Sequence, residues 1–396
     1  MMKKILVALL LLSMLLLLLL AWKYSGDSYL EEKMRDTYGE MTTVSTTETQ
    51  TAPPETTEVP VTAEMPVTTA ATVEVPPEQV EADTVLLFGG DVNLDAALGP
   101  WQVYTEAGRD LAACIDASLV EQMRSAHIFM VGNVFAFTDV TQGLDKRYTF
   151  RTVPENVEIY RKMGVDIVSL ANNHVYDFGA VGLTDTLQTL NVAGIVNVGA
   201  GENLAEASRA RFANFNGLRI AYTAAMRSEK YVHTPEATET SSGVMKMYDL
   251  AAYTDTVAKA AADSDFVIAY VHWGTENSLA LEQEQIDGAH ALIDAGADIV
   301  IGSHTHTLQP VEFYNGKPIF YSIGNLWSDL QSTESALVRV TLGADKTVKS
   351  IELVPCETAE GKTTAASAVL RDAIFARLNE SASASVSSDG IVTEKK

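Results

Sequence analysis

Short apolar runs alternate with amphipathic stretches between Val85 and Ile301. The runs have the length and composition of buried strands: Val85–Phe88, Ile128–Val131, Ile167–Leu170, Ile195–Val198, Arg219–Thr223, Phe266–Val271 and Ile299–Ile301. The stretches between them show helical spacing: Asp110–Ser125, Asn156–Met163, Ala180–Leu190, Leu250–Ala262 and Leu281–Ala295. This alternation predicts a mostly parallel sheet with helices packed on it.

The later apolar runs have no helical stretch between them. They are Pro310–Tyr314, Pro318–Ser322, Ala336–Leu342 and Ser350–Val354. We expect these strands to be antiparallel, with Asn315-Gly316 as a tight turn. The chain is therefore predicted to form a mixed, two-sheet α/β sandwich. One further helix is expected at Ala365–Leu378, followed by a tail too polar to pack.

The N-terminal 24 residues have the pattern of a membrane anchor. Lys3 and Lys4 precede the apolar run Ile5–Leu20, and extension of that run to Trp22 approaches the ~20 residues that span a bilayer. A cleaved signal peptide has a similar start, but no small-x-small cleavage site follows the leucines. Both interpretations place the rest of the chain outside the cell, and the uncleaved anchor is the favoured one.

A linker is predicted between the anchor and the folded part. Residues 41–82 contain Thr, Glu and Pro but no Lys, Arg, Phe, Tyr or Trp, so this segment cannot bury enough apolar surface to fold. The expected organisation is an anchor at 1–24, a disordered linker at 25–82, a domain at 83–357 and a C-terminal helix and tail at 358–396. The linker would hold the domain away from the membrane.

The net charge of -24 argues against nucleic acid and anionic lipid as partners, because phosphate binding needs a basic surface. An anionic substrate would need a local basic patch. The cluster Lys146, Arg147 and Arg151 lies near a candidate site, and these residues are weak substrate-binding candidates together with Glu276. The sequence leaves open whether the two cysteines, Cys114 and Cys356, form a disulfide bridge or are two buried thiols.

Chemically capable residues follow four of the predicted strands. Asp91 ends the first run, Asn173-His174 follows Ile167–Leu170, and His272 ends Phe266–Val271. The fourth run leads to His304-Thr-His306, whose imidazoles we expect on one face because strand side chains alternate. The carboxyl ends of parallel strands meet at one edge, so these residues are predicted to share a site.

Carboxylate, imidazole and amide oxygen ligands together suit a divalent Mn, Zn or Fe ion, and two such ions would activate water for attack on phosphate. The predicted metal ligands are Asp91, Asn93, Asn173, His272, His304 and His306. His174 is the predicted catalytic residue, as a general acid or a hydrogen-bond donor. Asp177 and Gly179 are expected to shape the turn and to cap a helix beginning at Ala180.

Five motifs together resemble the CapA (PgsA) family of poly-γ-glutamate capsule synthesis proteins. They are Gly90-Asp-Val92, the run Ser169–Gly179, His272-Trp-Gly274 with Glu276, Gly302-Ser-His-Thr-His306, and the run Pro318–Asn325. The resemblance extends from about Thr84 to Pro355 and keeps the order of the motifs. It implies a calcineurin-like metallophosphatase fold, an αββα sandwich of mixed sheets.

Two residues depart from what the resemblance implies. Calcineurin-like enzymes have an Asp-x-His where this chain has Asn93, and Val134 stands where members similar to this chain have a carboxylate. Without a bridging carboxylate two close cations repel each other. We therefore expect at most one weakly held metal, bound by Asn173, His272 and His304 or by Asp91 and His306.

The resemblance also implies a function. It indicates a membrane-anchored, extracellular accessory of poly-γ-glutamate assembly or export, with the anionic polymer and the membrane subunits of its synthase as partners. ATP-dependent ligation is not expected, since no Gly-x-x-x-x-Gly-Lys-Ser/Thr loop is present. Two alternatives stay open: an exported metal-dependent hydrolase of phosphoesters or γ-glutamyl polymer, and a scaffold that keeps only the fold.

Overall fold

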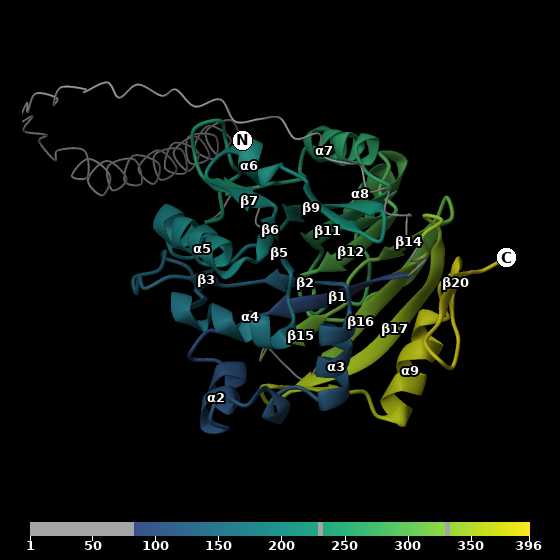
Figure 1. Cartoon of the computed structure of the whole chain (residues 1–396), viewed down its shortest axis with the longest axis horizontal. Helices are drawn as coiled ribbons and strands as arrows, with labels where there is room; N and C mark the ends of the chain where they lie inside the picture. Colours follow the sequence, from purple (N-terminus) through teal and green to yellow (C-terminus); the bar gives the residue numbers. More distant parts are fainter. Residues whose placement is uncertain (1–82, 229–232, 329–332) are drawn as a thin grey trace, which may run out of the picture. The chain divides into compact units, whose positions relative to one another are not determined.

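The structure, a computed structural model, describes residues 83–228, 233–328 and 333–396. The predicted anchor and linker lie outside these residues. In the described part no helix has the length and apolar character needed to cross a membrane. Two β-sheets dominate this part (Figure 1).

The first sheet has eight strands in the order β18-β17-β16-β1-β2-β5-β6, with β15 also paired to β1. Its parallel strands are β1 (Thr84–Val92), β2 (Ile128–Asn133), β5 (Ile167–Ser169), β6 (Val196–Val198) and β15 (Asn325–Trp327). Its antiparallel strands are β16 (Thr333–Leu342), β17 (Val348–Ala359) and β18 (Lys362–Ala365).

The second sheet has six strands in the order β13-β14-β12-β11-β9-β8. Its parallel centre consists of β9 (Leu218–Arg227), β11 (Phe266–Trp273), β12 (Ile299–Ser303) and β14 (Lys317–Phe320). Antiparallel strands β8 (Arg211–Phe215) and β13 (Val311–Tyr314) form its edges. Three short pairs complete the strands: β3 (Ala136–Phe137) with β4 (Arg151–Thr152), β7 (Ala200–Gly201) with β10 (Gly243–Val244), and β19 (Ala384–Val386) with β20 (Val392–Glu394).

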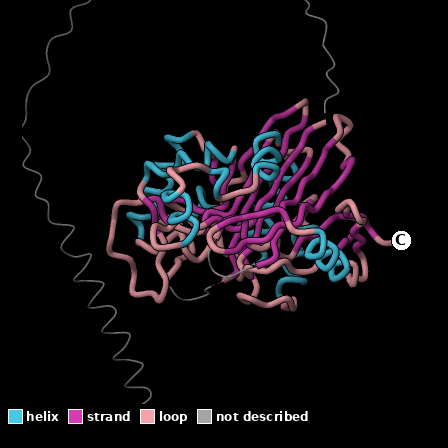
Figure 2. Tube along the Cα trace, turned by 90° about the horizontal axis from the view of Figure 1, so that it is seen from below, coloured by secondary structure: helices cyan, strands magenta, loops and turns pink. Residues whose placement is uncertain are grey.

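Helices lie on both sides of the strands (Figure 2). They are α2 (Gly99–Glu106), α3 (Ala117–Ser125), α4 (Glu158–Met163), α5 (Gly179–Ala193), α6 (Leu204–Ala207), α7 (Leu250–Ala262), α8 (Gln283–Asp294) and α9 (Ala368–Leu378), with 3-10 turns η2 (Leu111–Ala113) and η3 (Pro154–Val157). One apolar core joins side chains of both sheets, and Tyr270 of the second sheet donates a hydrogen bond to the Gly89 carbonyl of the first. A separate core packs α7 and α8 on the second sheet. The predicted mixed, two-sheet α/β arrangement is confirmed.

Several boundaries differ from the sequence-based expectation for physical reasons. The expected helix Asp110–Ser125 is split, because Ile115 pairs with Thr363 of β18 and so takes an extended conformation. Helix α2 was not expected, since its start, Gly99-Pro100, has the composition of a turn. Proline is tolerated there because the first turn of a helix needs no N–H.

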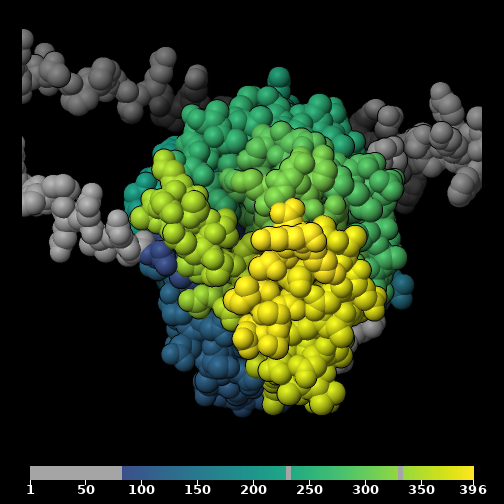
Figure 3. Space-filling model, turned by 90° about the vertical axis from the view of Figure 1, so that its right-hand side faces the viewer, coloured from purple at the N-terminus to yellow at the C-terminus, as the bar shows by residue number. Residues whose placement is uncertain are grey.

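The expectation that the C-terminal tail is too polar to pack is wrong. Strands β19 and β20 form a hairpin in which Ala384, Val386 and Val392 are buried. Asn379, just after α9, fixes this hairpin by bonding both the N–H and the carbonyl of Val386. Figure 3 shows the C-terminal residues, in yellow, lying directly against the preceding part of the chain. Alternation of single apolar residues with serine was the signal for a strand.

The cysteines are two buried free thiols, which decides between the two open interpretations. Burial raises the pKa of Cys114 to about 11 and that of Cys356 to about 12. Both groups are therefore protonated at neutral pH and act as small apolar side chains.

A close contact between backbones gives a stability prediction. A Cβ at Gly90 would lie 1.8 Å from the Gly324 carbonyl oxygen, so Gly90→Ala forces β1 and β15 apart. We expect it to lower the free energy of unfolding in urea by about 2–3 kcal/mol. The control is Gly288→Ala in α8, where the nearest atom is the flexible end of Met247, and this change should stay within about 1 kcal/mol. Equal effects of the two changes would contradict the role given to Gly90.

Candidate functional site

Asp91 lies at the end of β1, where the pairing of β1 shifts register with both neighbouring strands. Its carboxylate is fully buried, and Oδ2 accepts the His304 N–H at 3.1 Å. The other oxygen, Oδ1, has no hydrogen-bond partner among the described residues and lies 3.7 Å from His272 Nδ1. Burial raises the pKa of Asp91 to about 6, against the opposing effect of His306 and the His304 N–H.

A glycine makes room for this carboxylate. Gly132 of β2 pairs with Asp91, and a Cβ at Gly132 would lie 2.4 Å from Asp91 Oδ1 and 3.1 Å from the Tyr270 hydroxyl. Any side chain at this position would therefore displace the carboxylate. Gly132 thus has a role in the site that its place in an apolar strand did not indicate.

The two histidines of the His-x-His motif lie beyond the strand and not within it. Strand β12 ends at Ser303, and His304 and His306 have positive φ angles of 90° and 58°. The expectation that they share a face through strand alternation is therefore wrong in its geometry. Left-handed backbone is strained for residues with a Cβ, and such strain is concentrated at functional sites. Their ring centroids lie 6.1 Å apart.

Three of the predicted ligands form one buried group, Asn173, His272 and His304. His272 Nε2 lies 3.0 Å from Asn173 Oδ1, and its Nδ1 lies 2.9 Å from Ser303 Oγ. The rings of His272 and His304 have centroids 4.5 Å apart. Burial, with the neighbouring imidazoles, lowers the pKa of His304 to about 3 and that of His272 well below its usual range. Both imidazoles are therefore neutral, the form that binds metals.

The other predicted ligands, Asp91, Asn93 and His306, lie on the neighbouring strand ends. His306 Nδ1 lies 2.9 Å from Asn325 Oδ1, a contact that orients its ring. Asn93 Oδ1 accepts the Asp95 N–H at 3.1 Å, which fixes the orientation of the amide because a backbone N–H can only donate. Its NH₂ group is buried and has no partner among the described residues. The Asn93 oxygen is thus occupied by the Asp95 N–H, and the group left without a partner is a hydrogen-bond donor, which cannot bind a metal.

These residues fit one divalent cation better than two. Asn173 Oδ1 and His272 Nε2 are spaced as adjacent ligands of one ion, whereas the unpartnered Asp91 Oδ1 lies nearest the other ring nitrogen of His272, Nδ1. No set of three His, Cys, Asp or Glu side chains in the described ranges is arranged to hold a metal. A cation bound here would supply Lewis-acid chemistry, polarising a bound oxygen or a water.

Val134 directly follows β2, two residues after Gly132. Its N–H donates to the Val92 carbonyl at 3.1 Å, which continues the ladder by one residue. Its side chain is buried but belongs to neither apolar core of the described residues, whereas Phe135 packs in the core. The expected approach of Val134 to within about 5 Å of His272 and His304 stays a prediction.

His174 is oriented by a buried carboxylate that the sequence did not place in the site. Asp177 Oδ2 lies 2.8 Å from His174 Nδ1 and accepts the Phe150 N–H, while Oδ1 pairs with Lys146 at 3.0 Å. This leaves His174 Nε2 for a proton transfer or a hydrogen bond to a ligand. The expectation that Asp177 caps the helix is wrong, because Phe178 occupies the cap position of α5.

Asn172 holds the loop that carries Asn173 and His174. Its amide donates to the Asn133 carbonyl at 2.7 Å and its oxygen accepts the N–H groups of His174 and Val175. Asn133 is fixed in turn by the Tyr160 hydroxyl at 2.7 Å. The roles of Asn133, Tyr160 and Asn172 were not predicted from the sequence, although two successive asparagines after a strand are a signal for such a turn.

Of the basic cluster only Lys146 reaches the site, where it also donates to the Asn173 carbonyl. Arg147 is exposed beside Tyr148, and Arg151 donates to the Thr138 carbonyl. Glu276 is exposed on the loop after β11. Trp273 and Trp327 are fully buried, and each donates its indole N–H to a backbone carbonyl.

Residues 85–330 match the family model of the bacterial capsule synthesis protein PGA_cap. This chain belongs to that family. The match covers all the strand ends described above. The PGA_cap chain is 34% identical over 228 residues to "Capsule biosynthesis protein CapA" of Bacillus anthracis, a match covering 56% of this chain and 54% of that protein.

Two further relatives of the PGA_cap chain are similar. "PGA biosynthesis protein CapA" of Bacillus subtilis is 29% identical over 73% of this chain and 76% of its own length. "Probable polyglutamine synthesis accessory protein Rv0574c" of Mycobacterium tuberculosis is 36% identical over 47% of this chain and 51% of its own length. The chain thus spans about half the length of the B. anthracis and M. tuberculosis relatives.

Solved structures give weaker matches. A "novel phosphatase" of Mycoplasma pneumoniae aligns with a TM-score of 0.45 at 13% identity, covering 70% of this chain and 94% of that one. The NAD nucleotidase NadN of Haemophilus influenzae aligns with a TM-score of 0.41 at 14% identity, covering 76% and 63%. Scores below 0.5 do not establish a common fold.

The position of Val134 gives a prediction for metal binding. Titration calorimetry of the wild type with Mn²⁺ or Zn²⁺ should show one equivalent or fewer, bound weakly, because two imidazoles and an amide carry no charge. Val134→Glu should raise the affinity about tenfold or more by adding a carboxylate. The control is Val134→Gln, which has the same length without the charge and should not raise it. Two tightly bound metals in the wild type would show that another carboxylate, such as Asp91, bridges them.

The buried pair of Lys146 and Asp177 gives a second prediction. Asp177→Asn should lower the free energy of unfolding in urea by about 3 kcal/mol, because Lys146 is left buried without its carboxylate. Lys146→Met should lower it less, and the double variant should recover part of the loss. Strictly additive effects in this cycle would show that the two side chains do not stabilise each other.

Proposed function

We propose that this PGA_cap protein acts in the synthesis of a poly-γ-glutamate capsule, as an accessory factor that binds or assembles the polymer. The observation that carries the proposal is the family match over residues 85–330. Relatives from two Bacillus species carry names of capsule or PGA biosynthesis. The proposed partners are the anionic polymer and the membrane subunits of its synthase.

The proposed location is the outer face of the cell membrane. Residues 1–24 would form the anchor, with Lys3 and Lys4 on the cytoplasmic side, and residues 25–82 would form the spacer. The metallophosphatase-like αββα fold belongs to the same proposal. It is supported by the motif order and by the two sheets that bring the motifs to one edge.

The proposed site can bind an anionic chain despite the net charge of -24. Asn173, His272 and His304 are neutral ligands. A divalent Mn, Zn or Fe ion held by them would therefore retain its positive charge and could attract a carboxylate of the polymer. Lys146 adds a fixed positive charge beside them, although Asp177 offsets part of it. Polymer binding at this site would therefore depend on the metal.

A second candidate function is metal-dependent hydrolysis of a phosphoester or of the γ-glutamyl polymer. The observation that favours it is the pair of His174 and Asp177, with Nδ1 of the imidazole at 2.8 Å from the carboxylate. Such a pair orients a histidine for proton transfer to a leaving group.

Gene deletion tests the first function. In a strain that makes the polymer, deletion should reduce surface poly-γ-glutamate, and the wild-type gene should restore it. His304→Ala should fail to restore it, whereas His290→Ala, a histidine of α8 outside the site, should succeed. Unchanged surface polymer after deletion would refute the role in capsule synthesis.

Purified full chain tests the second function. With Mn²⁺ or Zn²⁺ added, a hydrolase should cleave a generic phosphodiester or shorten the polymer, and His304→Ala should abolish this. His174→Ala should lower kcat by about 100-fold or more if the imidazole transfers a proton. The absence of turnover with every metal would leave only the binding role.

A further inference from the structure

A groove separate from the histidine site lies between α5 and the turn η3 with α4. It has a volume of about 470 Å³ and is lined by residues of these elements and by Asp139. This volume lies within the ~300–1,000 Å³ typical of ligand sites. None of the predicted metal ligands lines it.

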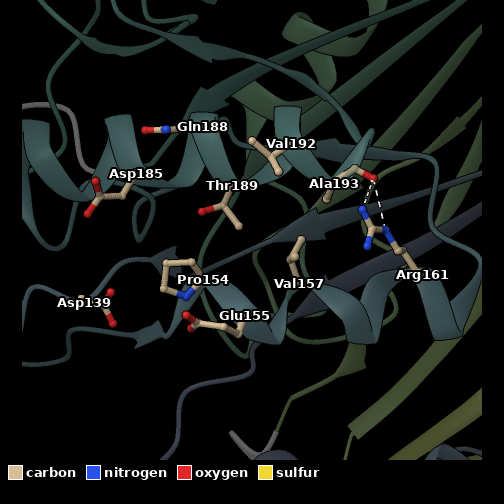
Figure 4. A pocket seen from close by; sticks show the side chains of 10 residues that line it. All are labelled: Asp139, Pro154, Glu155, Val157, Arg161, Asp185, Gln188, Thr189, Val192 and Ala193. Carbon is tan, nitrogen blue, oxygen red and sulfur yellow. Dashed lines mark hydrogen bonds between the residues drawn. The ribbon is translucent and has the colours of Figure 1, made fainter.

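The two ends of the groove differ in chemistry. Figure 4 shows Asp139 and Asp185 toward one end of the groove, Glu155 and Val192 nearer its middle, and Arg161 beside Ala193 at the other end. No Lys or Arg of the described ranges forms an ion pair with any of these three carboxylates. The one basic side chain in the lining, Arg161, is held by the Ala193 carbonyl through its Nε and Nη2. The acidic end thus keeps its negative charge.

The apolar part of the groove includes an exposed valine. Val192 is 76% exposed on α5, and Val181, three turns back on the same helix and outside the groove lining, is 52% exposed. Val181, Asp185 and Val192 recur at helical spacing and form one face of α5. Val157 lines the opposite wall of the groove. Val192 is one of several exposed large apolar side chains of the described residues, and it is distinguished by its place in the lining of the groove.

We propose that this groove binds a short polypeptide segment of a partner protein in which basic side chains are followed by aliphatic ones. The basic side chains would meet Asp139, Glu155 and Asp185, and an aliphatic side chain would cover Val157 and Val192. A simple polyamine matches only the acidic end. An anionic polymer is repelled by it, so the groove and the histidine site bind opposite kinds of ligand.

Fluorescence anisotropy on the full chain in a neutral detergent tests this proposal. The probe is a rhodamine-labelled hexapeptide of three arginines and three leucines, compared with one of three glutamates and three leucines. The arginine peptide should bind and the glutamate peptide should not. Binding should weaken as NaCl is raised from 0.05 to 0.5 M, because exposed charges are screened.

Substitutions inside and outside the groove show whether the arginine peptide binds there. Glu155→Gln and Asp139→Asn, both at exposed positions, should each raise the Kd of the arginine peptide about threefold. Val192→Ser should raise it by a similar factor. The matched controls are Glu380→Gln and Val369→Ser, an exposed acid and an 82% exposed valine outside the groove, and they should change nothing.

Three results would overturn the proposal: no binding of the arginine peptide, equal binding of the glutamate peptide, or equal effects of groove and control variants. The test involves neither metal nor polymer. It therefore stands or fails independently of the proposed role in capsule synthesis.

Discussion

The hydrogen bond from the His304 N–H to Asp91 Oδ2 joins the two sheets at the edge where the site lies. It links residues 213 positions apart, one after β12 of the second sheet and one at the end of β1 of the first. The bond needs the left-handed backbone of His304 and the missing side chain of Gly132. A buried carboxylate and strained backbone both cost stability, and the packed cores of the two sheets offset this cost.

The charge balance around Asp91 explains the character of the site. His272 and His304 are neutral because burial disfavours their protonated forms. The carboxylate therefore has no fixed positive partner among them, and one of its oxygens is unpartnered. A cation held by Asn173 and His272 Nε2 would lie at the other ring nitrogen of His272 from that oxygen, which approaches Nδ1. A second cation would meet the NH₂ of Asn93 and, on the predicted alignment, the aliphatic side chain of Val134, with no bridging charge to reduce repulsion.

The strands that carry the site residues could be predicted from the sequence. The arrangement of backbone and side chains at the ends of those strands could not. The strands before Asp91, His272 and His304 were expected because buried parallel strands have a strong apolar signal. The positive φ angles of the His-x-His motif could not be expected, since the partners of its residues, Asp91 for the His304 N–H and Asn325 for the His306 ring, are distant in sequence. Two of the three bonds of Asp177, to the Phe150 N–H and to Lys146, join loops that are distant in sequence and have no local signature, whereas the third, to His174, is local. The C-terminal hairpin was missed because its apolar residues are single and surrounded by serine.

The cation site proposed at the strand ends consists of Asn173, His272 and His304. Anomalous diffraction from crystals of the protein soaked in Mn²⁺, recorded at the manganese edge, tests it most directly. We expect one peak in the anomalous map, bounded by these three side chains. Two peaks flanking Asp91, or one bounded by Asn93 and His306 without His272, would contradict the account.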